Sequence, residues 1–474
     1  MAAKRASSAS AAARPRAAEI AAASKVPATT STARSASPAV PAAEFAAAAA
    51  ATRSACGMVR RVAATRRLHN RGTDLLWAAD DAGRRQGIDA IIVPTARPPA
   101  YLAQAAALAH ALGCTLVTLH SKQWTSAAKA AQRLPRNVDL LAVDIRDPAQ
   151  LRLPNWETSR LLAGTVFDRR TDTSAKRNIA LLLSRMLGWS RVLFLDDDIT
   201  ELNPDDVRRA SGLLDMYNAV GLHVDGFPDH SVVCHAYRQA GGSQQAFIGG
   251  GALAVHLERS TSFFPDIYND DWFFLLDGDK GIQPVGVTGT VRQFPYDPFR
   301  NADRARGEEL GDVLAEGIYW LLDQGGSVTD ADQAHWIKFL VRRRRFIERV
   351  LRMVEQDGTL ESAERARRMA ALKGSLGRLR LITPKLCEDY LRAWAADRQH
   401  WHRALQKPPI RSIQQLSGQE RLPHAVAALS RPGVPRLTWQ SGAQGSPLDA
   451  SEPNSQHSDR QEAKAALVVA APSG

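Results

Sequence analysis

Three consecutive carboxylates end an apolar run in "RVLFLDDDIT" (191–200). Just beyond a strand, residues i and i+2 project the same way, so Asp196 and Asp198 can converge on one point. Two carboxylates that close raise each other's pKa unless a cation joins them, and oxygen ligands suit a hard cation. The pattern therefore predicts an Mg²⁺ or Mn²⁺ site that would bridge to phosphate oxygens. A solvated turn at a strand end is the alternative.

A second acidic pair, Asp270 and Asp271 in "FPDIYNDDWFF", opens a predicted helix. A carboxylate at this position can take the proton of a hydroxyl group if its surroundings tune its pKa. The same two residues are also favourable charges at the positive end of a helix dipole. Both interpretations stay open, and of the two residues we favour Asp271 as the base.

Basic and small residues lie between and beside these acidic groups. Lys176 and Arg177 stand near the start of the predicted helix in "TDTSAKRNIALLLSRMLG" (171–188), where phosphate binding is favourable; a solvated basic turn is the alternative. The glycines of "FIGGGALAV" interrupt a strand pattern, which indicates either a bulge or a close approach of another group.

The elements that must position these residues alternate between strands and helices. Continuous apolar runs at 89–94, 115–120, 138–144 and 191–195 predict strands, and helical periodicity separates them. This pattern predicts an α/β fold, with a mainly parallel sheet and helices on both of its faces. Ligands of such sheets bind beyond the carboxyl ends of the strands, where the three carboxylates are expected.

Four motifs, "IIVPTARP", "TSAKRNIALLLSRMLGWSRVLFLDDDI", "FIGGGALAV" and "FPDIYNDDWFF", occur in the order used by glycosyltransferases of the A-type fold. Over residues 88–300 the chain resembles the family-2-type enzymes most. The resemblance implies a Rossmann-like sheet, a nucleotide-sugar donor and a DxD motif after a central strand. It also implies a divalent cation and transfer to an acceptor hydroxyl with inversion of the anomeric centre. The identity of the acceptor stays open.

The resemblance also implies roles for individual residues. Asp196 and Asp198 match the metal-binding DxD, and Asp271 or Asp270 matches the general base. The second strand ends in "LHSK" rather than in the acidic residues that contact base or ribose in the family, and Asp144 is the candidate substitute. The remaining predicted donor-binding residues are Pro94, Thr95, Arg97, Lys176, Arg177, Asn178, Asp196, Asp197, Gly249, Gly250 and Gly251.

Two other function classes fit parts of the sequence. "DDDIT" matches the DxDxT signature of haloacid-dehalogenase-type phosphatases, in which Asp196 would be the nucleophile and Asp198 the acid/base, with Mg²⁺. That signature normally lies on the first strand of its domain, whereas several predicted strands precede it here. The chain could also be a non-catalytic interaction protein with a lapsed transferase domain, and metal-dependent nucleotide-sugar binding would distinguish the two.

Composition divides the chain into four segments. Residues 1–66 consist mainly of Ala, Ser, Thr, Pro and Arg, with too few large apolar side chains to offset chain entropy, so we expect disorder there. The transferase domain is expected over 67–302 and a helical extension over 303–405. A second disordered tail is expected over 406–474.

The chain is basic, with 61 Lys and Arg against 49 Asp and Glu. "HWIKFLVRRRRFIERVLRMVE" (335–355) predicts a basic amphipathic helix, which either packs on the domain with a solvated face or contacts an anionic membrane surface. Aromatic residues do not interleave with a basic patch as in known modules, so we expect no nucleic-acid partner. Four scattered cysteines without CxxC spacing indicate a reducing compartment. We expect a cytoplasmic protein, peripheral at the inner membrane face.

Overall fold

The computed structural model describes residues 77–78, 85–122, 124–169, 171–225, 231–243, 248–278, 281–430 and 438–441. The segment 1–66, for which disorder is predicted, and most of the residues after 430 lie outside the described ranges. The prediction of disorder is therefore untested for those parts of the chain.

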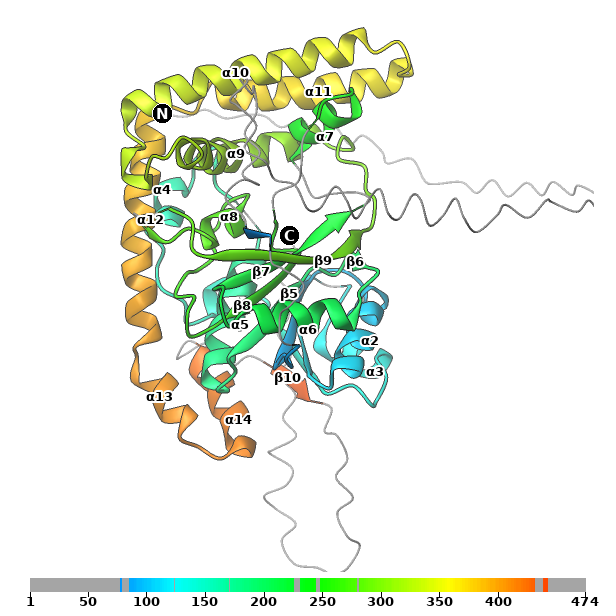
Figure 1. Ribbon diagram of the computed structural model, residues 1–474, viewed down its shortest axis with the longest axis vertical. Coiled ribbons are helices and arrows are strands. Elements are labelled where there is room, and N and C mark those ends of the chain that lie inside the picture. Colours follow the sequence, from blue (N-terminus) through cyan, green and yellow to red (C-terminus); the bar gives the residue numbers. More distant parts are fainter. Residues whose placement is uncertain are drawn as a thin grey trace, which may run out of the picture. The chain divides into compact units, whose positions relative to one another are not determined.

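A single mixed sheet forms the centre of the described structure (Figure 1). Its order is β1-β9-β7-β8-β5-β2-β3-β4-β10, and the short β6 pairs with β9. The strands are β1 (Trp77–Ala78), β2 (Ala90–Thr95), β3 (Thr115–His120), β4 (Leu140–Asp144), β5 (Arg191–Leu195), β6 (Ile199–Thr200), β7 (Ala219–Asp225), β8 (Ala252–His256), β9 (Val285–Gln293) and β10 (Thr438–Ser441).

The sheet differs from the predicted, mainly parallel one in its central part. β5, β2, β3 and β4 are parallel neighbours, as expected. β8, however, runs antiparallel between β5 and β7. The reason is the point at which the chain re-enters the sheet: β8 begins at the edge where β5 ends, with Ala252 opposite Leu195, so it pairs in the opposite direction.

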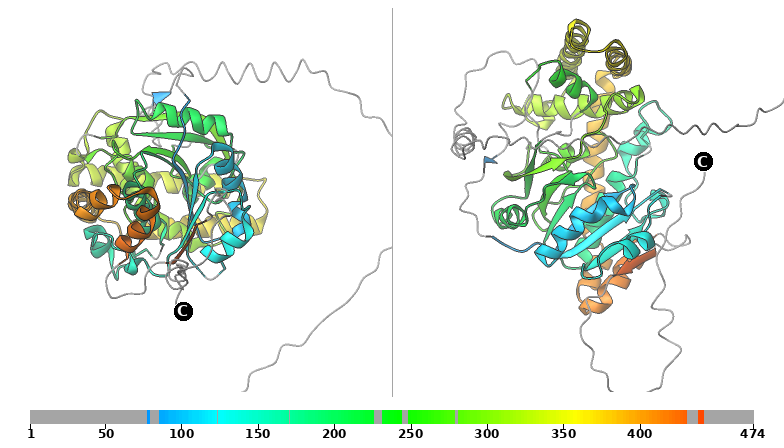
Figure 2. Two further views of the ribbon diagram at one scale, coloured as in Figure 1. Left: turned by 90° about the horizontal axis from the view of Figure 1, so that it is seen from below. Right: turned by 90° about the vertical axis from the view of Figure 1, so that its right-hand side faces the viewer.

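Helices cover both faces of the sheet, which confirms the predicted Rossmann-like α/β class (Figures 1 and 2). Alternate residues of each strand enter different cores: Leu193 and Leu195 face one side, and Val192 and Phe194 face the other. The first core is covered by α2 (Ala103–Leu112), α3 (Ala127–Arg133) and α6 (Pro204–Leu213). The second is covered by α4 (Glu157–Leu162), α5 (Thr173–Met186), α7 (Val232–Gln239), α8 (Asp270–Phe274) and the helices after β9.

The part after β9 is helical, as predicted. Its long helices are α9 (Ala302–Leu322), α10 (Gln333–Gln356), α11 (Ser362–Leu379) and α12 (Pro384–Leu405). One short 3-10 helix, η5 (Val328–Asp330), lies in this part, and two others, η2 (Pro99–Leu102) and η3 (Pro148–Gln150), lie earlier in the chain. The long helices belong to the same hydrophobic core as α5 and the face of the sheet that α5 covers. None of the helices in the described ranges combines the length and hydrophobicity that a membrane span requires.

The start of the predicted disordered tail is folded instead. α13 (Pro408–Gln414) and α14 (Gly418–Leu429) pack against α5, and β10 pairs with the outer edge of β4. The few large apolar residues of this segment are buried, among them Ile410, Ile413 and Leu429. Ser417 and Glu420 form a capping box at the start of α14. The composition of the segment did not indicate these helices, because the sheet domain and not the segment itself supplies most of the core against which they pack.

Candidate active site

A cavity of about 390 Å³ lies at the carboxyl edge of the sheet, directly beyond β5. A larger cavity, of about 1100 Å³ between α2 and α3, has no carboxylate in its lining, so size alone does not identify the site. The smaller cavity combines residues of β2, α5, the β5 end and the segment after β9. Its lining is Pro94, Thr95, Ala96, Arg97, Asp172, Thr173, Lys176, Asp196, Asp197, Asp198, Gln293, Tyr296 and Arg304.

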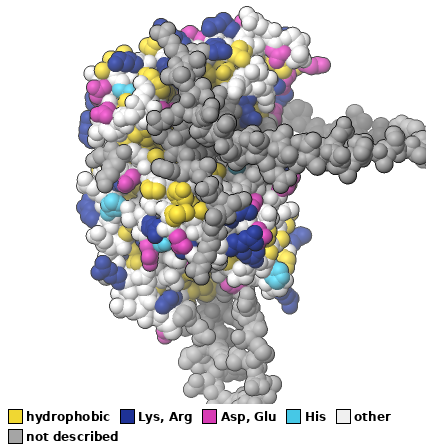
Figure 3. All heavy atoms as spheres, in the orientation of Figure 1, with side chains coloured by type: hydrophobic (Ala, Val, Ile, Leu, Met, Phe, Trp, Pro, Cys, Tyr) yellow, Lys and Arg dark blue, Asp and Glu magenta, His cyan; other side chains and the backbone are white. Residues whose placement is uncertain are grey.

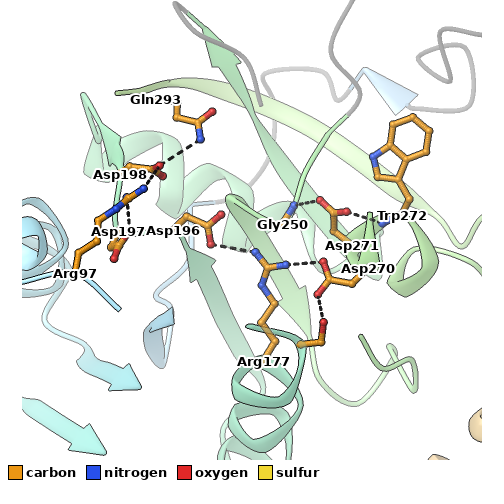
Figure 4. A network of polar contacts seen from close by, with 11 residues as sticks. Arg97, Arg177, Asp196, Asp197, Asp198, Gly250, Asp270, Asp271, Trp272 and Gln293 are labelled. Atoms are coloured by element: carbon orange, nitrogen blue, oxygen red, sulfur yellow. Dashed lines mark hydrogen bonds and ion pairs between the residues drawn. The ribbon is translucent and has the colours of Figure 1, made fainter. Parts of the chain in front are cut away.

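The three carboxylates after β5 bind two different guanidinium groups (Figure 4). Asp196 accepts a hydrogen bond from Nη2 of Arg177 at 3.0 Å. Asp197 accepts one from Nη1 of Arg97 at 2.6 Å, and Asp198 accepts one from Nη2 of Arg97 at 3.1 Å. Asp196 and Asp198 both line the cavity, but each is bound by a different arginine and not directed at one common partner, in contrast to the expectation from strand geometry.

A turn explains this difference. The backbone N–H of Ile199 donates to the carbonyl oxygen of Asp196 at 3.2 Å, so the chain leaves the extended conformation at Asp196. The rule that residues i and i+2 project alike holds only for extended chain. Asp198 consequently turns toward Arg97, while Asp196 remains above the strand.

Burial makes Asp197 and Asp198 costly to ionise. Desolvation raises the pKa of Asp197 above its usual range, although hydrogen bonds from Thr95 and Arg97 oppose the shift. Desolvation followed by the charge of Asp196 raises the pKa of Asp198. The turn is thus a place where additional positive charge would be stabilising.

Arg177 connects the carboxylate turn to the second acidic pair. Its Nη1 donates to Oδ1 of Asp270 at 3.0 Å, while its Nη2 donates to Asp196. The guanidinium is buried and lies over the ring of Phe264, 5.3 Å from the ring centroid. Asp270 also accepts a hydrogen bond from Ser174 at the start of α5. Both oxygens of Asp270 are therefore engaged in holding Arg177 and α5 in place.

Asp271 has a different environment from Asp270. Its Oδ2 accepts a hydrogen bond from the backbone N–H of Gly250 at 2.6 Å, and its Oδ1 accepts one from the N–H of Trp272 at 2.9 Å. It is half-buried, whereas Asp270 is buried. Of the predicted pair, Asp271 is thus the carboxylate more accessible to a bound molecule.

The three glycines before β8 pass close to the site side chains. A Cβ atom on Gly250 would lie 3.0 Å from the guanidinium of Arg177, and one on Gly249 would lie 3.1 Å from Oδ2 of Asp271. One on Gly251 would lie 3.4 Å from Oδ2 of Asp196. The close-approach interpretation of these glycines is therefore the one that the geometry supports, and the neighbours are the acidic and basic side chains of the site.

Lys176 lies at the floor of the cavity. Its Nζ donates to the carbonyl oxygen of Thr95 at 2.8 Å and to Oγ of Ser121 at 2.6 Å, and it pairs with Asp172 at 3.1 Å. Desolvation lowers its pKa, although the charge of Asp172 opposes the shift. Lys176 therefore ties the loop after β2 to α5, and its charge lies beneath the cavity.

Six predicted donor-binding residues are outside the cavity lining. Arg177, Gly249, Gly250 and Gly251 lie beside Asp196 or Asp271, whereas Asn178 and Asp144 are turned into the fold. The amide of Asn178 donates to the carbonyl oxygen of Phe264 at 2.7 Å and accepts from its N–H at 2.8 Å. Asp144 accepts from the N–H of Ala127 at 2.7 Å, and desolvation raises its pKa to about 6. Both side chains are buried and hold backbone segments of the fold.

Six residues that line the cavity were not predicted as site residues: Ala96, Asp172, Thr173, Gln293, Tyr296 and Arg304. Gln293 ends β9, and its Nε2 is 3.5 Å from Oδ2 of Asp198. Arg304 donates to the hydroxyl of Tyr296 at 2.8 Å and to Glu308 at 2.6 Å. The signal was present in "RQFPYDPFRNADRAR", where aromatic and basic residues cluster after a strand.

The carboxylate oxygens of the turn suit a hard divalent cation, although the described residues form no complete set of metal ligands. Among the described residues, no group of three or more His, Cys, Asp or Glu side chains is arranged to hold a metal ion. Asp196 and Asp198 nevertheless both line the cavity with carboxylate oxygens, the ligands that Mg²⁺ and Mn²⁺ prefer. Within those same residues, each carboxylate uses one oxygen for an arginine, which leaves the other for a ligand.

No protein-family model matches the sequence, and no curated protein matches it. Among solved structures, the chain is similar to the mannosyltransferase PcManGT from Pyrobaculum calidifontis in complex with GDP-Man and Mn²⁺. The match has 15% sequence identity and a TM-score of 0.30, and it covers 74% of this chain and 89% of that chain.

Proposed function

We propose that this protein is a metal-dependent glycosyltransferase of the A-type fold, similar to the family-2 enzymes. It would move a sugar from a nucleotide-sugar donor to an acceptor hydroxyl, with inversion of the anomeric centre. The observation that carries the proposal is the cavity at the carboxyl edge of the sheet, where four carboxylates and three cations, Arg97, Lys176 and Arg304, surround one space. Charges of both signs suit a ligand that is a metal-bound diphosphate.

The donor would lie against the loop after β2. Pro94, Thr95 and Arg97 line the cavity on that side, and Lys176 lies below them. Arg97 can donate to phosphate oxygens, since guanidinium groups recognise phosphate through several N–H groups at once. The proposal leaves out Asn178 and Asp144, because both side chains are buried and hold backbone segments of the fold.

Asp196 and Asp198 would hold the divalent cation. When bound, this cation would neutralise the charge that develops on the leaving nucleoside diphosphate. Asp197 would keep Arg97 and Thr95 in place beside it, as its two hydrogen bonds support. The glycines before β8 would allow the transferred sugar to approach the backbone near Asp271 and Arg177.

Asp271 would take the proton of the acceptor hydroxyl. Its hydrogen bond from Gly250 fixes the carboxylate beside the glycine stretch, and its partial exposure allows an acceptor to reach it. Asp270 would act through Arg177, as a positioning residue. Inversion needs one displacement at the sugar carbon, which a single base on the acceptor side can assist.

The proposal keeps the expected division of the chain, with a transferase domain over 67–302 and a helical extension over 303–405. The extension would contribute Arg304 to the cavity. The proposed location is the cytoplasm, at the inner face of the membrane.

Thermal unfolding with a panel of nucleotide-sugars, with and without Mn²⁺, tests the proposal. A donor present at about 100 times its Kd should add roughly 2.7 kcal/mol to the free energy of unfolding. Asp198→Asn should remove the metal-dependent part of this gain. Asp389→Asn, at a half-buried carboxylate of α12 outside the cavity, is the matched control and should keep all of it.

Two other results would overturn the proposal. Hydrolysis of phosphate esters without any response to nucleotide-sugars would support the phosphatase alternative, with Asp196 as nucleophile. If the protein neither binds nor turns over either substrate class, that result would support the non-catalytic alternative.

A further inference from the structure

The outward face of α10 has no packing partner among the described residues. The opposite face of this helix is buried, through Trp336, Phe339, Phe346 and Val350. Residues one and two turns apart on the outward side, by contrast, are exposed or half-buried over the length of the helix. The face is therefore displayed by a helix that the core holds in a fixed orientation.

Five cations occupy this outward face. Within the described ranges, none of them is in an ion pair, whereas the inward Arg343 is fully paired. Glu348 and Glu355 are the carboxylates on the same side. The cations are Lys338, Arg344, Arg345, Arg349 and Arg352.

Two aliphatic side chains lie within this basic face. Ile337 is 53% exposed and Val341, one turn later, is 44% exposed. Neither contributes to the core clusters. Figure 3 shows hydrophobic and basic side chains next to one another along the upper edge of the molecule, where α10 runs in Figure 1. Aliphatic side chains placed among unpaired cations suit a surface that is both negatively charged and apolar beneath its charges.

We propose that the outward face of α10 binds an anionic lipid surface. The helix would lie flat on the membrane, with Arg344, Arg345 and their neighbours at the phosphate level and with Ile337 and Val341 between the headgroups. Its 24 residues form a straight rod of about 36 Å, which matches a plane better than a curved protein pocket. Between residues 337 and 352 the outward face has no aromatic or amide side chain that could read nucleic-acid bases.

This inference stands apart from the proposed transferase activity, because it uses none of the site residues. It can therefore hold or fail whichever substrate the cavity takes. The Arg-rich segment 1–66 is a second source of positive charge, so the test must separate it from α10.

Cosedimentation of the full chain with vesicles provides the test. Vesicles of equal amounts of phosphatidylcholine and phosphatidylglycerol should bind the protein, and vesicles of phosphatidylcholine alone should not. The double variant Arg344→Gln/Arg345→Gln should lower the partition coefficient roughly 30-fold, since each basic residue near such a surface contributes about fivefold. Ile337→Ser/Val341→Ser should lower the partition coefficient without changing its dependence on salt.

The matched control is Lys385→Gln/Arg392→Gln on the exposed side of α12, which removes the same charge elsewhere and should leave the partition coefficient unchanged. Circular dichroism of every variant shows whether it is folded. Equal binding by wild type and the α10 variants would overturn the proposal, because segment 1–66 would then supply the attraction. Binding of α10 to duplex DNA in place of vesicles would overturn it as well.

Discussion

Replacing Arg343 should destabilise the protein in a way that depends on pH. Arg343 of α10 faces three carboxylates of α9 and is 1% exposed. Its Nε and Nη2 donate to the two oxygens of Glu309 at 2.9 and 3.0 Å. Nη2 also donates to Asp312 at 2.6 Å, and Nη1 donates to Glu316 at 2.9 Å. One buried guanidinium therefore satisfies three buried acids.

The size of the destabilisation depends on the buried carboxylates that the substitution leaves without a cation. Arg343→Met keeps the volume of the side chain but leaves the three carboxylates without their central cation, and breaking a buried ion pair in this way costs about 3 to 5 kcal/mol. The other groups facing the cluster are Arg342, Cys234, Ser231, Asn269 and Ser375. Of these only Arg342 is charged, and it is directed over the ring of Trp320, so little compensation is available.

The sign of the pH dependence can be worked out from the acids. Desolvation already raises the pKa of Glu309, Glu316 and Asp312, the last to about 6. Without Arg343 these pKa values must rise further, because the cation that opposes the shift is gone. An acid with a raised pKa in the folded state destabilises the fold once the pH exceeds its unfolded value. The decrease in the free energy of unfolding caused by Arg343→Met should be largest near pH 8. It should shrink toward pH 5, by about 1.4 kcal/mol for each unit by which the substitution raises a carboxyl pKa further.

Guanidinium chloride unfolding followed by circular dichroism at both pH values measures this. Arg345→Met is the matched control: it lies on the same helix but is exposed, so its effect should stay within about 0.5 kcal/mol. Equal losses for the two variants, or a loss for Arg343→Met that is the same at both pH values, would refute the reasoning.

Three further predictions concern the site. Asp271→Asn should lower kcat for sugar transfer by about 10² to 10⁴, as expected for loss of a general base, while donor affinity measured by calorimetry stays unchanged; an equal fall in affinity would contradict the assignment. Gly250→Ala places a methyl group 3.0 Å from the guanidinium of Arg177 and should weaken donor binding about tenfold, whereas Gly307→Ala, with no atom within 4 Å, should not. Desolvation raises the pKa of Glu308 to about 7, so this one group should contribute a fall of about 3 kcal/mol to the free energy of unfolding between pH 4.5 and 7. Glu308→Gln should remove that slope, and an unchanged slope in denaturant titrations would refute the shift.

Local signals predicted much of the fold and the place of the site. Asn203 followed by Pro204 is typical of a helix start, and α6 begins there, with the Asn203 side chain accepting a hydrogen bond from the N–H of Asp205. The apolar run before Asp196 is a central strand that ends at the cavity. These features depend on neighbours in the sequence, so the sequence displays them directly.

The features that were missed depend on contacts between distant segments. The direction of β8 is set by where the chain re-enters the sheet, which no local pattern encodes. In the run Arg342–Arg345 only Arg343 is buried, because successive residues of a helix differ by about 100° and only one position faces α9. Asp144 was a candidate for nucleotide recognition, but the start of α3 folds over it. Burial of this kind is caused by an element distant in the sequence, so it can be recognised only once the position of that element in the fold is known.

The pairing of β10 with β4 matters for anyone who shortens this chain. β4 would otherwise be the last strand of the sheet, and its outer backbone N–H and C=O groups would be bare. Uncovered strand edges of this kind recruit strands from other molecules. A recombinant version that stops at Ser430, before Thr438–Ser441, should therefore self-associate and precipitate during purification, even though every residue of the proposed site would be present.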